Sequence, residues 1–558
     1  MDDVTWDPPG KGPWELEATH NARPMSRFGQ AWFSAGFVRG FSEGTARYGL
    51  LLDHLKPDFV NSFMYSQPVA FGAPEGAMGP PPKPVLWLLT RLVPKMRARI
   101  AKSERAMANK QWRADLKMWD EVDKPAAIAR HREIQAVDVS ALTDDELVAH
   151  LRTCADHCEA SVYLHHKYTS TSIIAAGDFL AGAQEWTGAA AGELLDLLRG
   201  SSRISRGFAA DELDNAGKSL ATNDAARETL MSQQEPAAVL AALTSDPSVG
   251  ADVRAYVEAV RYRSLGYDVC DVNVGEMPDL LVAALRAAAE GTTGADEPRD
   301  NAEQLRSRVP AEHLDEFDER LAEARLVNRI RDERGVYSDG WATGLARRAL
   351  LEAGRRLTAA GKLHAAEHAA DLTPEEVVAL LSGGPGPSAD EVAKHVEWRT
   401  TKTLADAPPF LRAMPAPPPP VEVLPARARR AARAVEVVIA NLFGVPETPN
   451  SDVVLTGLAV NDGVYEGTAR LVDNMDEFGR IQQGDVLVTR MTSPYFNVVL
   501  PLLGAIVTDR GGQLCHAAIV AREYGIPGIV GTREATVKIA DGARIRVDGT
   551  TGEVRILS

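Results

Sequence analysis

The chain has 558 residues, 45% hydrophobic and 25% charged, which is enough for about three or four domains with sizeable cores. A formal net charge of −16 argues against a nucleic-acid partner, because polyanion binding depends on clustered Lys and Arg. Four cysteines are too few for a disulfide framework, so we expect a reducing, cytoplasmic location. The first residues lack a signal-peptide pattern, and the apolar run 85–93 is too short to span a bilayer, so we expect no membrane partner.

Residues 1–80 are rich in Gly, Pro and aromatic residues and show weak periodicity. The segment 14–27 concentrates polar groups that can serve chemistry, including His20 and Arg23. A second interpretation of the same segment is an N-terminal arm that packs on helices. From about 85 to 200 the pattern is helical, and Thr143 with Glu146 predicts a helix start with a capping box.

The helix after Thr143 carries cysteines and histidines at spacings of three and four, which places them on one face. These residues are Cys154, His157, Cys158, Ser161 and His165. The face can bind a metal, line a polar pocket, or be satisfied within a helical bundle. Because no second ligand pair follows at zinc-finger spacing, we expect no metal site. If the face lines a pocket, His165 or its neighbour His166 would touch a substrate.

Helical patterns continue from 208 to about 361. The stretch 216–219 looks like the end of a nucleotide-binding P-loop, but Glu212 stands where the loop needs its first glycine, so we exclude a P-loop. Further on, Arg331 and Arg334 are one helical turn apart and can clamp a phosphoryl group. A salt-bridged exposed helix is the alternative. A proline-rich stretch, 408–420, predicts a stiff linker, and a charged helix follows to about 442.

The C-terminal segment has the most specific pattern. Residues 503–507 predict a short buried strand, two glycines turn the chain, and a helix runs from Ala517 to about Gly525. His516 therefore lies at a helix N-terminus, where free N–H groups and the helix dipole favour an anion. Its imidazole is nucleophilic when neutral, so it can carry a phosphoryl group. Glycines beside it would let the backbone approach the phosphate.

The run 508–531, TDRGGQLCHAAIVAREYGIPGIVG, resembles the mobile phosphohistidine domain of the phosphoenolpyruvate (PEP)-utilising enzymes. The resemblance extends upstream through 457–463, 467–470 and 484–488 and covers about the last hundred residues. It implies that His516 is transiently phosphorylated and that Gly511, Gly512 and Cys515 form the loop beside the phosphate.

Weaker similarities connect the rest of the chain to the same family, through the acceptor-substrate domain of rifampin phosphotransferase and phenylphosphate synthase. Segment 14–27 resembles the opening of that domain, 261–278 loosely resembles an internal part, and 329–361 resembles an Arg-Glu helical segment. In this family such arginines face the phosphohistidine. We therefore expect an α+β multidomain protein. It has a mainly helical acceptor domain (1–405), a proline-rich linker and helix (406–448), and a small α/β swivelling phosphohistidine domain (449–558).

Family members usually also contain an ATP-grasp domain or a PEP barrel. We find no glycine-rich phosphate loop between strands and no strand-rich N-terminal block. The chain most resembles the histidine-bearing subunit of phenylphosphate synthase and of the enzyme that phosphorylates 4-cresol and other alkylphenols in aromatic degradation. That resemblance implies a separate ATP-grasp subunit that binds ATP and Mg²⁺, and a phenolic hydroxyl as acceptor. The alternatives are a component of an antibiotic (rifamycin-like) phosphotransferase and a non-catalytic phosphocarrier.

The predicted mechanism assigns roles to named residues. His516 accepts the phosphoryl group, and Arg331 with Arg334 stabilises it. His20 is the first candidate for the base that deprotonates the acceptor, ahead of His165 and His166. Substrate-binding roles are predicted for the two histidines just named and for Arg23 and Arg263.

Overall fold

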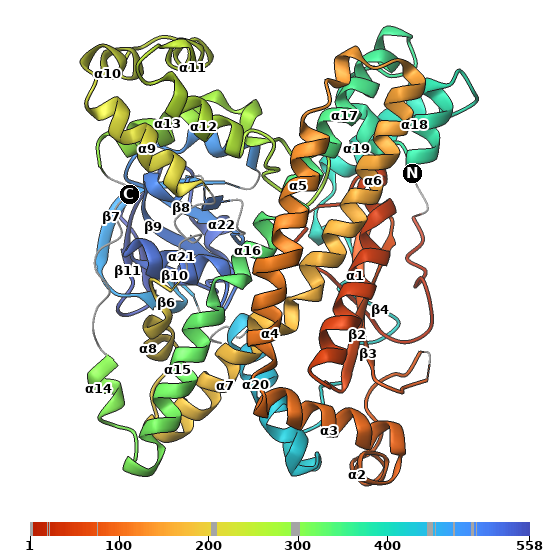
Figure 1. Ribbon diagram of the computed structural model, residues 1–558, viewed down its shortest axis with the longest axis vertical. Coiled ribbons are helices and arrows are strands. Elements are labelled where there is room, and N and C mark those ends of the chain that lie inside the picture. The colour runs from red at the N-terminus through yellow and green to blue at the C-terminus, as the bar shows by residue number, and fades with distance from the viewer. Residues whose placement is uncertain are drawn as a thin grey trace. The chain divides into compact units, whose positions relative to one another are not determined.

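The computed structural model (Figure 1) describes residues 4–18, 20–21, 23–74, 76–201, 209–291, 302–443, 450–451, 453–472, 475–492, 496–497 and 499–557. Contacts divide the chain into two compact units. Unit 1 comprises Met1–Ile173, Tyr267–Cys270 and Arg334–Arg433; unit 2 comprises Ile174–Gly266, Asp271–Glu333 and Ala434–Ser558. None of the helices within the described ranges has the length and apolar character needed to traverse a bilayer.

Unit 1 is mainly helical, with one small antiparallel sheet. Its elements are β1 (Trp14–Leu16), α1 (Arg27–Arg47), β2 (Leu52–Val60), β3 (Phe63–Ala70), α2 (Lys83–Leu92), α3 (Pro94–Ala108), α4 (Gln111–Met118), α5 (Lys124–Gln135), α6 (Asp144–Lys167), α17 (Asp339–Ala359), α18 (Pro374–Leu381), α19 (Ala389–Thr401) and β4 (Phe410–Leu411). The predicted capping box at the start of α6 is confirmed: Thr143 Oγ1 accepts from Glu146 N at 3.3 Å, and the Glu146 carboxylate accepts from Thr143 N at 2.8 Å.

Helix α1 lies directly against α6 because of a stripe of glycines at four-residue spacing. A Cβ added to Gly36 or Gly40 would collide with the carbonyl oxygens of Glu159 and Tyr163 on α6, and one added to Gly44 would come within 2.9 Å of the Lys167 carbonyl. Without side chains, the two backbones can approach to contact. This packing fixes the C-terminal end of α6, where His165 and His166 lie.

The four-stranded sheet, in the order β2-β3-β1-β4, contains strands that the sequence pattern does not predict. The β2–β3 hairpin turns at Asn61 and Ser62, both with positive φ (51° and 67°), as a two-residue turn between right-twisted strands requires. Because this turn lacks the usual glycine, the sequence gives little sign of it. Strand β4 comes from the proline-rich stretch and pairs with β1, so part of the predicted linker belongs to this sheet.

Unit 2 combines helices with an eight-stranded mixed sheet. Its elements are α8 (Ala191–Leu195), α9 (Ala210–Ala221), α10 (Asp224–Leu230), α11 (Pro236–Ser245), α12 (Gly250–Val260), α13 (Pro278–Ala289), α14 (Ala302–Arg306), α15 (Leu314–Asn328), β5 (Val454–Thr456), β6 (Leu458–Asn461), β7 (Val464–Leu471), β8 (Asp485–Thr489), β9 (Leu503–Thr508), α21 (His516–Tyr524), β10 (Gly528–Val530), α22 (Ala535–Lys538), β11 (Arg544–Asp548) and β12 (Glu553–Ile556). The excluded P-loop stretch lies inside α9.

The sheet order is β5-β12-β11-β7-β8-β9-β10-β6, with parallel pairing from β7 to β10 and antiparallel pairing elsewhere. Side chains of β8 alternate between two cores: Val486 and Val488 pack with Ala535 of α22, whereas Leu487 packs with α21 and with helices α9–α13. Burial on both faces explains the continuous apolar runs in the parallel strands. The expected α+β architecture, with a small C-terminal sheet domain, is confirmed.

Composition and contacts divide the chain differently. The prediction separates a helical domain from a carrier domain near residues 405 and 449, whereas the contacts group 174–266 and 271–333 with the C-terminal sheet. Three boundaries between the units fall inside helices, namely α7 (Thr169–Thr187), α16 (Ile330–Val336) and α20 (Ala426–Phe443). The charged helix predicted to end near 442 is α20.

Candidate functional sites

His516 is the first residue of α21, directly after β9 and the glycine turn, as the sequence predicts. The helix ends at Gly525, whose φ of 67° is the left-handed conformation that terminates helices. His516 therefore lies where a parallel strand leads into a helix N-terminus, a position suited to phosphate. Its side chain is only partly buried.

Both ring nitrogens of His516 have polar partners. Nδ1 lies 2.9 Å from Thr492 Oγ1, and Nε2 lies 2.9 Å from Asn497 Oδ1. An amide oxygen only accepts, so Nε2–H donates to Asn497 while the Thr492 hydroxyl donates to Nδ1. This arrangement is satisfied by the neutral imidazole, which is the nucleophilic form. Sequence reasoning did not identify Thr492 or Asn497, because neither belongs to the segment around His516.

Burial lowers the pKa of His516 to about 3, and the positive charge of Arg331 lowers it further in the same direction. Arg331 also donates to the backbone carbonyl of Leu514, two residues before the histidine. The arginine thus contacts the turn that leads into His516, and its charge adds to the larger effect of burial on the pKa of the ring. Of the two predicted arginines, Arg331 is the one that unit 2 brings to the carrier histidine.

The glycine loop has a role that the sequence does not predict. Gly512 N and Leu514 N donate to the carbonyls of Leu442 and Asn441 at the end of α20, at 2.9 Å each. Gly511 has φ of 108°, and a Cβ there would lie 2.6 Å from the sulfur of Cys515. These glycines are needed for a tight turn that joins α20 to the start of α21. In this arrangement the Gly512 N–H is directed to α20.

Replacing Arg331 by methionine should raise the pKa of His516 above about 3, because a cation next to the ring is lost, whereas burial, the larger cause, still holds it below the ordinary value of 6.5. A larger fraction of the ring would then be protonated at acidic pH, and a protonated ring cannot attack phosphorus. The measurement is an NMR titration of the His516 imidazole in both proteins. Arg325→Met, on the exposed surface of α15 in the same unit, is the matched control. An unchanged His516 pKa in Arg331→Met would contradict this role.

Unit 1 contains a second polar cluster, which begins at His20. Its Nδ1 lies 2.9 Å from Glu17 Oε1, and its ring meets the Tyr267 ring edge-on at 5.2 Å. Desolvation lowers the pKa of His20, but the charge and hydrogen bond of Glu17 outweigh it, so the pKa lies above its ordinary value. With Nδ1–H donating to Glu17, the lone pair of Nε2 is available to accept a proton. About half of the His20 side chain is exposed (51%).

A second histidine–carboxylate pair belongs to the same cluster. His165 Nδ1 lies 2.9 Å from Asp339 Oδ1, and Arg334 donates to the His165 carbonyl and, at 2.9 Å, to Thr169 Oγ1. Burial lowers the pKa of His165 despite the Asp339 charge, and the charges of Arg334 and His20 act in the same direction as burial. His20 and His165 are therefore two bases with oppositely shifted pKa values.

His166 closes the apolar side of this cluster. Its ring lies 3.9 Å from Phe37 and 4.7 Å from the His165 ring, measured between centroids. Burial holds its pKa well below the ordinary value, so it is neutral at physiological pH. Unit 1 thus combines two imidazoles paired with carboxylates, one guanidinium and an aromatic wall.

The structure brings together most of the residues predicted for the acceptor site. His20, His165, His166 and Arg334 are in one cluster, and Arg23 contacts Cys270, close to Tyr267 in the same short segment of unit 1. Arg263 is instead buried in unit 2, where it donates to the Ala259 carbonyl at 3.2 Å. Sequence reasoning missed Glu17, Tyr267 and Asp339 as site residues. No local pattern marks Asp339, because it is 174 residues from its histidine partner.

Most residues on the cysteine-bearing face of α6 lie outside the cluster of His20, His165, His166 and Arg334. His157 Nε2 lies 2.8 Å from His131 Nδ1, Cys154 lies 3.7 Å from His150 Nε2, and Cys158 is buried. Burial lowers the pKa of His157 to about 4. These groups are therefore satisfied within the helical bundle, and only His165 reaches the cluster described above. No group of three or more His, Cys, Asp or Glu within the described residues is arranged to hold a metal ion.

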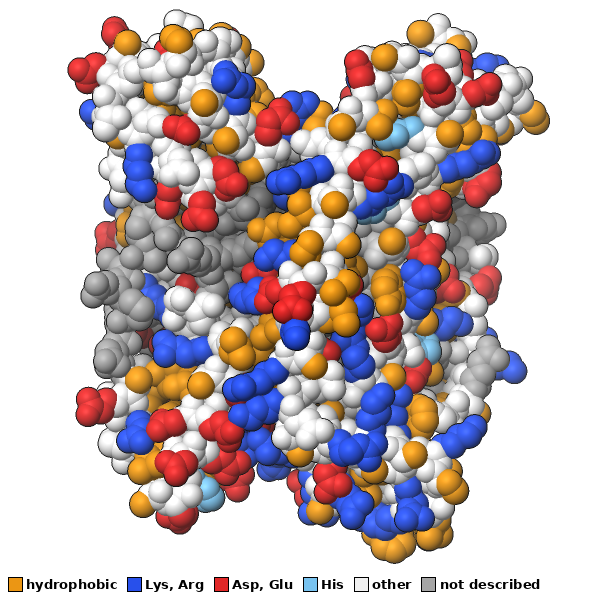
Figure 2. Space-filling view, in the orientation of Figure 1, with side chains coloured by type: hydrophobic (Ala, Val, Ile, Leu, Met, Phe, Trp, Pro, Cys, Tyr) orange, Lys and Arg blue, Asp and Glu red, His pale blue; other side chains and the backbone are white. Residues whose placement is uncertain are grey.

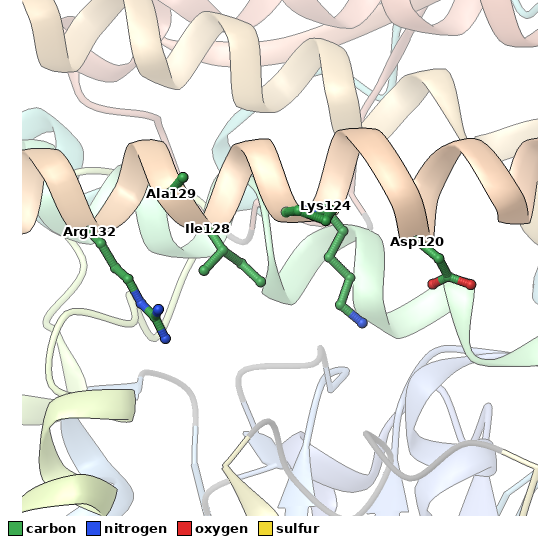
Figure 3. A pocket seen from close by; sticks show the side chains of 6 residues that line it. Asp120, Lys124, Ile128, Ala129 and Arg132 are labelled. Carbon is green, nitrogen blue, oxygen red and sulfur yellow. The ribbon is translucent and has the colours of Figure 1, made fainter.

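A shallow hollow follows α5 and the π-helical turn before it, Trp119–Asp123, on the surface of unit 1 (Figure 3). Its lining residues are Asp120, Lys124, Pro125, Ile128, Ala129 and Arg132. None of the predicted site residues lines this hollow, and it brings no nucleophile or base together. We assign it no role in the chemistry.

Residues 481–552 match the family model "PEP-utilising enzyme, mobile domain". The C-terminal region carries this mobile domain. Similar proteins include an uncharacterized phosphotransferase of Bacillus subtilis, YvkC, 32% identical over 41% of this chain and 26% of its own length. A probable phosphoenolpyruvate synthase of Pyrococcus abyssi is 44% identical over 20% of this chain and 13% of its own length. The rifampicin phosphotransferase of Streptomyces sviceus is 45% identical over 19% and 12%.

The chain therefore spans about a quarter or less of the length of these relatives. The residues matched to the mobile domain include β8, β9, α21 and His516.

Proposed function

We propose that this chain is a phosphotransferase in which the mobile domain carries phosphate on His516 to a hydroxyl compound held by the unit 1 cluster. The observation that carries the proposal is the neutral imidazole at the N-terminus of α21, with Arg331 beside it, in a segment that matches the mobile domain. The unit 1 cluster supports the second half-reaction, because it supplies a base, a cation and aromatic surface.

In the first half-reaction a separate ATP-grasp subunit, with ATP and Mg²⁺, phosphorylates His516. A ring nitrogen attacks the β-phosphorus and the bond to the α-phosphate oxygen breaks, so AMP leaves. Water then cleaves the β–γ linkage, which releases phosphate and leaves phosphohistidine. The attacking nitrogen needs its lone pair. Nδ1 exposes its lone pair once the hydrogen bond from Thr492 breaks, whereas Nε2 must first lose the proton that it donates to Asn497. The low pKa of His516 keeps the lone pair available throughout the physiological range.

In the second half-reaction the acceptor oxygen attacks phosphorus, the P–N bond breaks, and the ring nitrogen retains the electron pair. The acceptor proton passes to His20 Nε2, whose Nδ1–H is held by Glu17. Arg334 offers positive charge to the transferred group. Arg331 and Arg334 lie one turn apart in α16, so one short helix supplies an arginine to each site.

A phenol is the acceptor class that this cluster favours. The side chains of Tyr267, Phe37 and His166 give it aromatic surface. Phenols ionise at about pH 10, as tyrosine does, so a histidine base suffices to deprotonate them as the O–P bond forms. A rifamycin-like hydroxyl is the second candidate, favoured by the similarity to rifampicin phosphotransferases. That similarity covers less than a fifth of the chain, about the extent of the mobile domain, which carries no information about the acceptor.

The test is to combine the full chain with candidate ATP-grasp subunits, ATP, Mg²⁺ and a panel of phenols, with a rifamycin in a parallel reaction. The expected result is AMP together with an aryl phosphate, and label on His516 in reactions without acceptor. Label on His516 with no ester from any acceptor would favour a non-catalytic phosphocarrier. Ester formation from the rifamycin alone would replace the phenol as the acceptor.

A further inference from the structure

Helix α2 in unit 1 carries exposed apolar side chains. Val85, Leu88, Leu89 and Leu92 follow one another at three- and four-residue spacing, which places them in a single stripe. All four are exposed, from 37% to 66%, whereas Thr90 on the opposite face is almost fully buried (1%). Exposed apolar stripes of this kind mark interaction surfaces in folded proteins.

Two more apolar side chains on or near α2 are exposed. Trp87 is 48% exposed, and the Arg91 guanidinium lies 4.5 Å from the centre of its ring. Met78, shortly before α2, is 52% exposed. Tryptophan, arginine and lysine side chains are favoured at a membrane–water interface, because each has an apolar part and a polar end.

Positive charge surrounds this stripe. The segment 83–108 contains seven Lys or Arg and one Glu, although the whole chain carries a net charge of −16. On α3, Lys95, Lys102 and Arg105 share one exposed face. Figure 2 shows blue side chains gathered with orange ones over α2 and α3, at the lower right of the view.

The start of α20 adds to the same basic surface. Leu86 of α2, Ile100 of α3 and Leu424 with Ala428 beside and within α20 form one small core, so these three helices are held together. The first turns of α20 then present four exposed arginines, Arg427, Arg429, Arg430 and Arg433. The sequence favours the solvated face of a helix over a binding patch for this arginine run, and the structure packs the start of α20 against α2 and α3.

We propose that this surface, defined by the outer stripe of α2 and the basic residues of α3 and α20, binds an anionic membrane surface. Apolar side chains enter the boundary between headgroups and acyl chains, while Lys and Arg pair with anionic headgroups. The charge complementarity selects an anionic bilayer over a neutral one. A peripheral contact needs no membrane-spanning helix, so the short apolar run 85–93 suffices.

The test is co-sedimentation of the full chain with vesicles of phosphatidylcholine alone or with about 30 mol% phosphatidylglycerol. We expect binding to the anionic vesicles only, and its loss when the salt concentration rises from about 0.1 M to about 0.5 M. Leu88→Glu with Leu92→Glu should weaken the anionic-vesicle binding at least about tenfold. Lys95→Glu with Lys102→Glu should have a similar effect. Val537→Glu in unit 2, at an exposed valine (84%), is the matched control and should bind as the unchanged chain does.

Thermal unfolding followed by circular dichroism verifies that each variant is folded, which is expected because the substituted side chains are exposed. Equal binding to neutral and anionic vesicles, or unchanged binding by both double variants, would overturn the proposal. Absence of vesicle binding would also overturn it. If gel filtration then shows a dimer that Leu88→Glu with Leu92→Glu dissociates, the surface is a contact between two copies of the chain.

Discussion

Replacing His516 by alanine is expected to abolish phosphorylation of the chain and formation of the phosphate ester. No other side chain in the described part of unit 2 combines a helix N-terminus, a neutral imidazole and a neighbouring arginine in this way. The measurement is acid-labile, base-stable label on the protein after incubation with the ATP-grasp subunit and labelled ATP, with mass spectrometry to locate it. A full turnover rate in His516→Ala would eliminate the mechanism.

This substitution also leaves Thr492 and Asn497 without their hydrogen bonds to the His516 ring. Buried polar groups left unpaired cost about 1–3 kcal/mol each, so stability must be measured alongside activity. His516→Gln keeps a polar side chain at the position and should be equally inactive while disturbing these neighbours less. His313→Ala, at a partly exposed histidine of the same unit, should be labelled normally.

Replacing His20 by alanine should slow transfer to the acceptor by about 10²- to 10⁴-fold, the usual contribution of a general base. Labelling of His516 should remain intact, because His20 belongs to the unit 1 cluster and not to the carrier site. Single-turnover transfer from isolated phosphohistidine protein to a phenol measures this step alone. The control is His364→Ala, which removes an exposed histidine paired with Asp390 elsewhere in unit 1 and should leave transfer unchanged.

The pH dependence of this transfer distinguishes the two candidate bases. A base acts only when unprotonated, so its rate falls as pH drops through its pKa. The pKa of His20 is raised, so the acid limb should lie above pH 6.5 and move to lower pH in Glu17→Gln, which removes the raising charge. The pKa of His165 is lowered, so a limb below pH 6.5 that responds to Asp339→Asn would assign the base to His165 instead.

The surroundings of His516 are the most predictable part of this molecule. The strand, the glycine turn, the position of His516 and the end of the helix at Gly525 all depend on neighbouring residues, so a short stretch of sequence specifies them. The partners Thr492 and Asn497 are 24 and 19 residues away, and local patterns say nothing about them. The α20 contacts of the glycine loop lie still further away along the chain.

For the unit 1 cluster the sequence predicts candidate residues but not their contacts. His20, His165 and His166 are candidates because imidazole is rare and reactive, whereas their partners are common acidic and aromatic residues. The His20 ring contacts the Tyr267 ring, although almost 250 residues separate them in the sequence, and no periodicity predicts such a pair. The sequence predicts that Arg331 and Arg334 act on one phosphoryl group, and this stays a prediction. A unit boundary falls between residues 333 and 334, so Arg331 belongs to unit 2 and Arg334 to unit 1.

The glycine stripe of α1 has a consequence for altering the range of acceptors. At Gly36 and Gly40 the backbone of α1 contacts the backbone of α6 directly. No side chain of α1 lies between the helices at these positions, so none can be made larger or smaller to change their separation. Under the proposed function, variants made to change the acceptor range should therefore leave this helix pair intact. Glu17 and Tyr267 are the positions to vary, because both lie outside regular helices and strands.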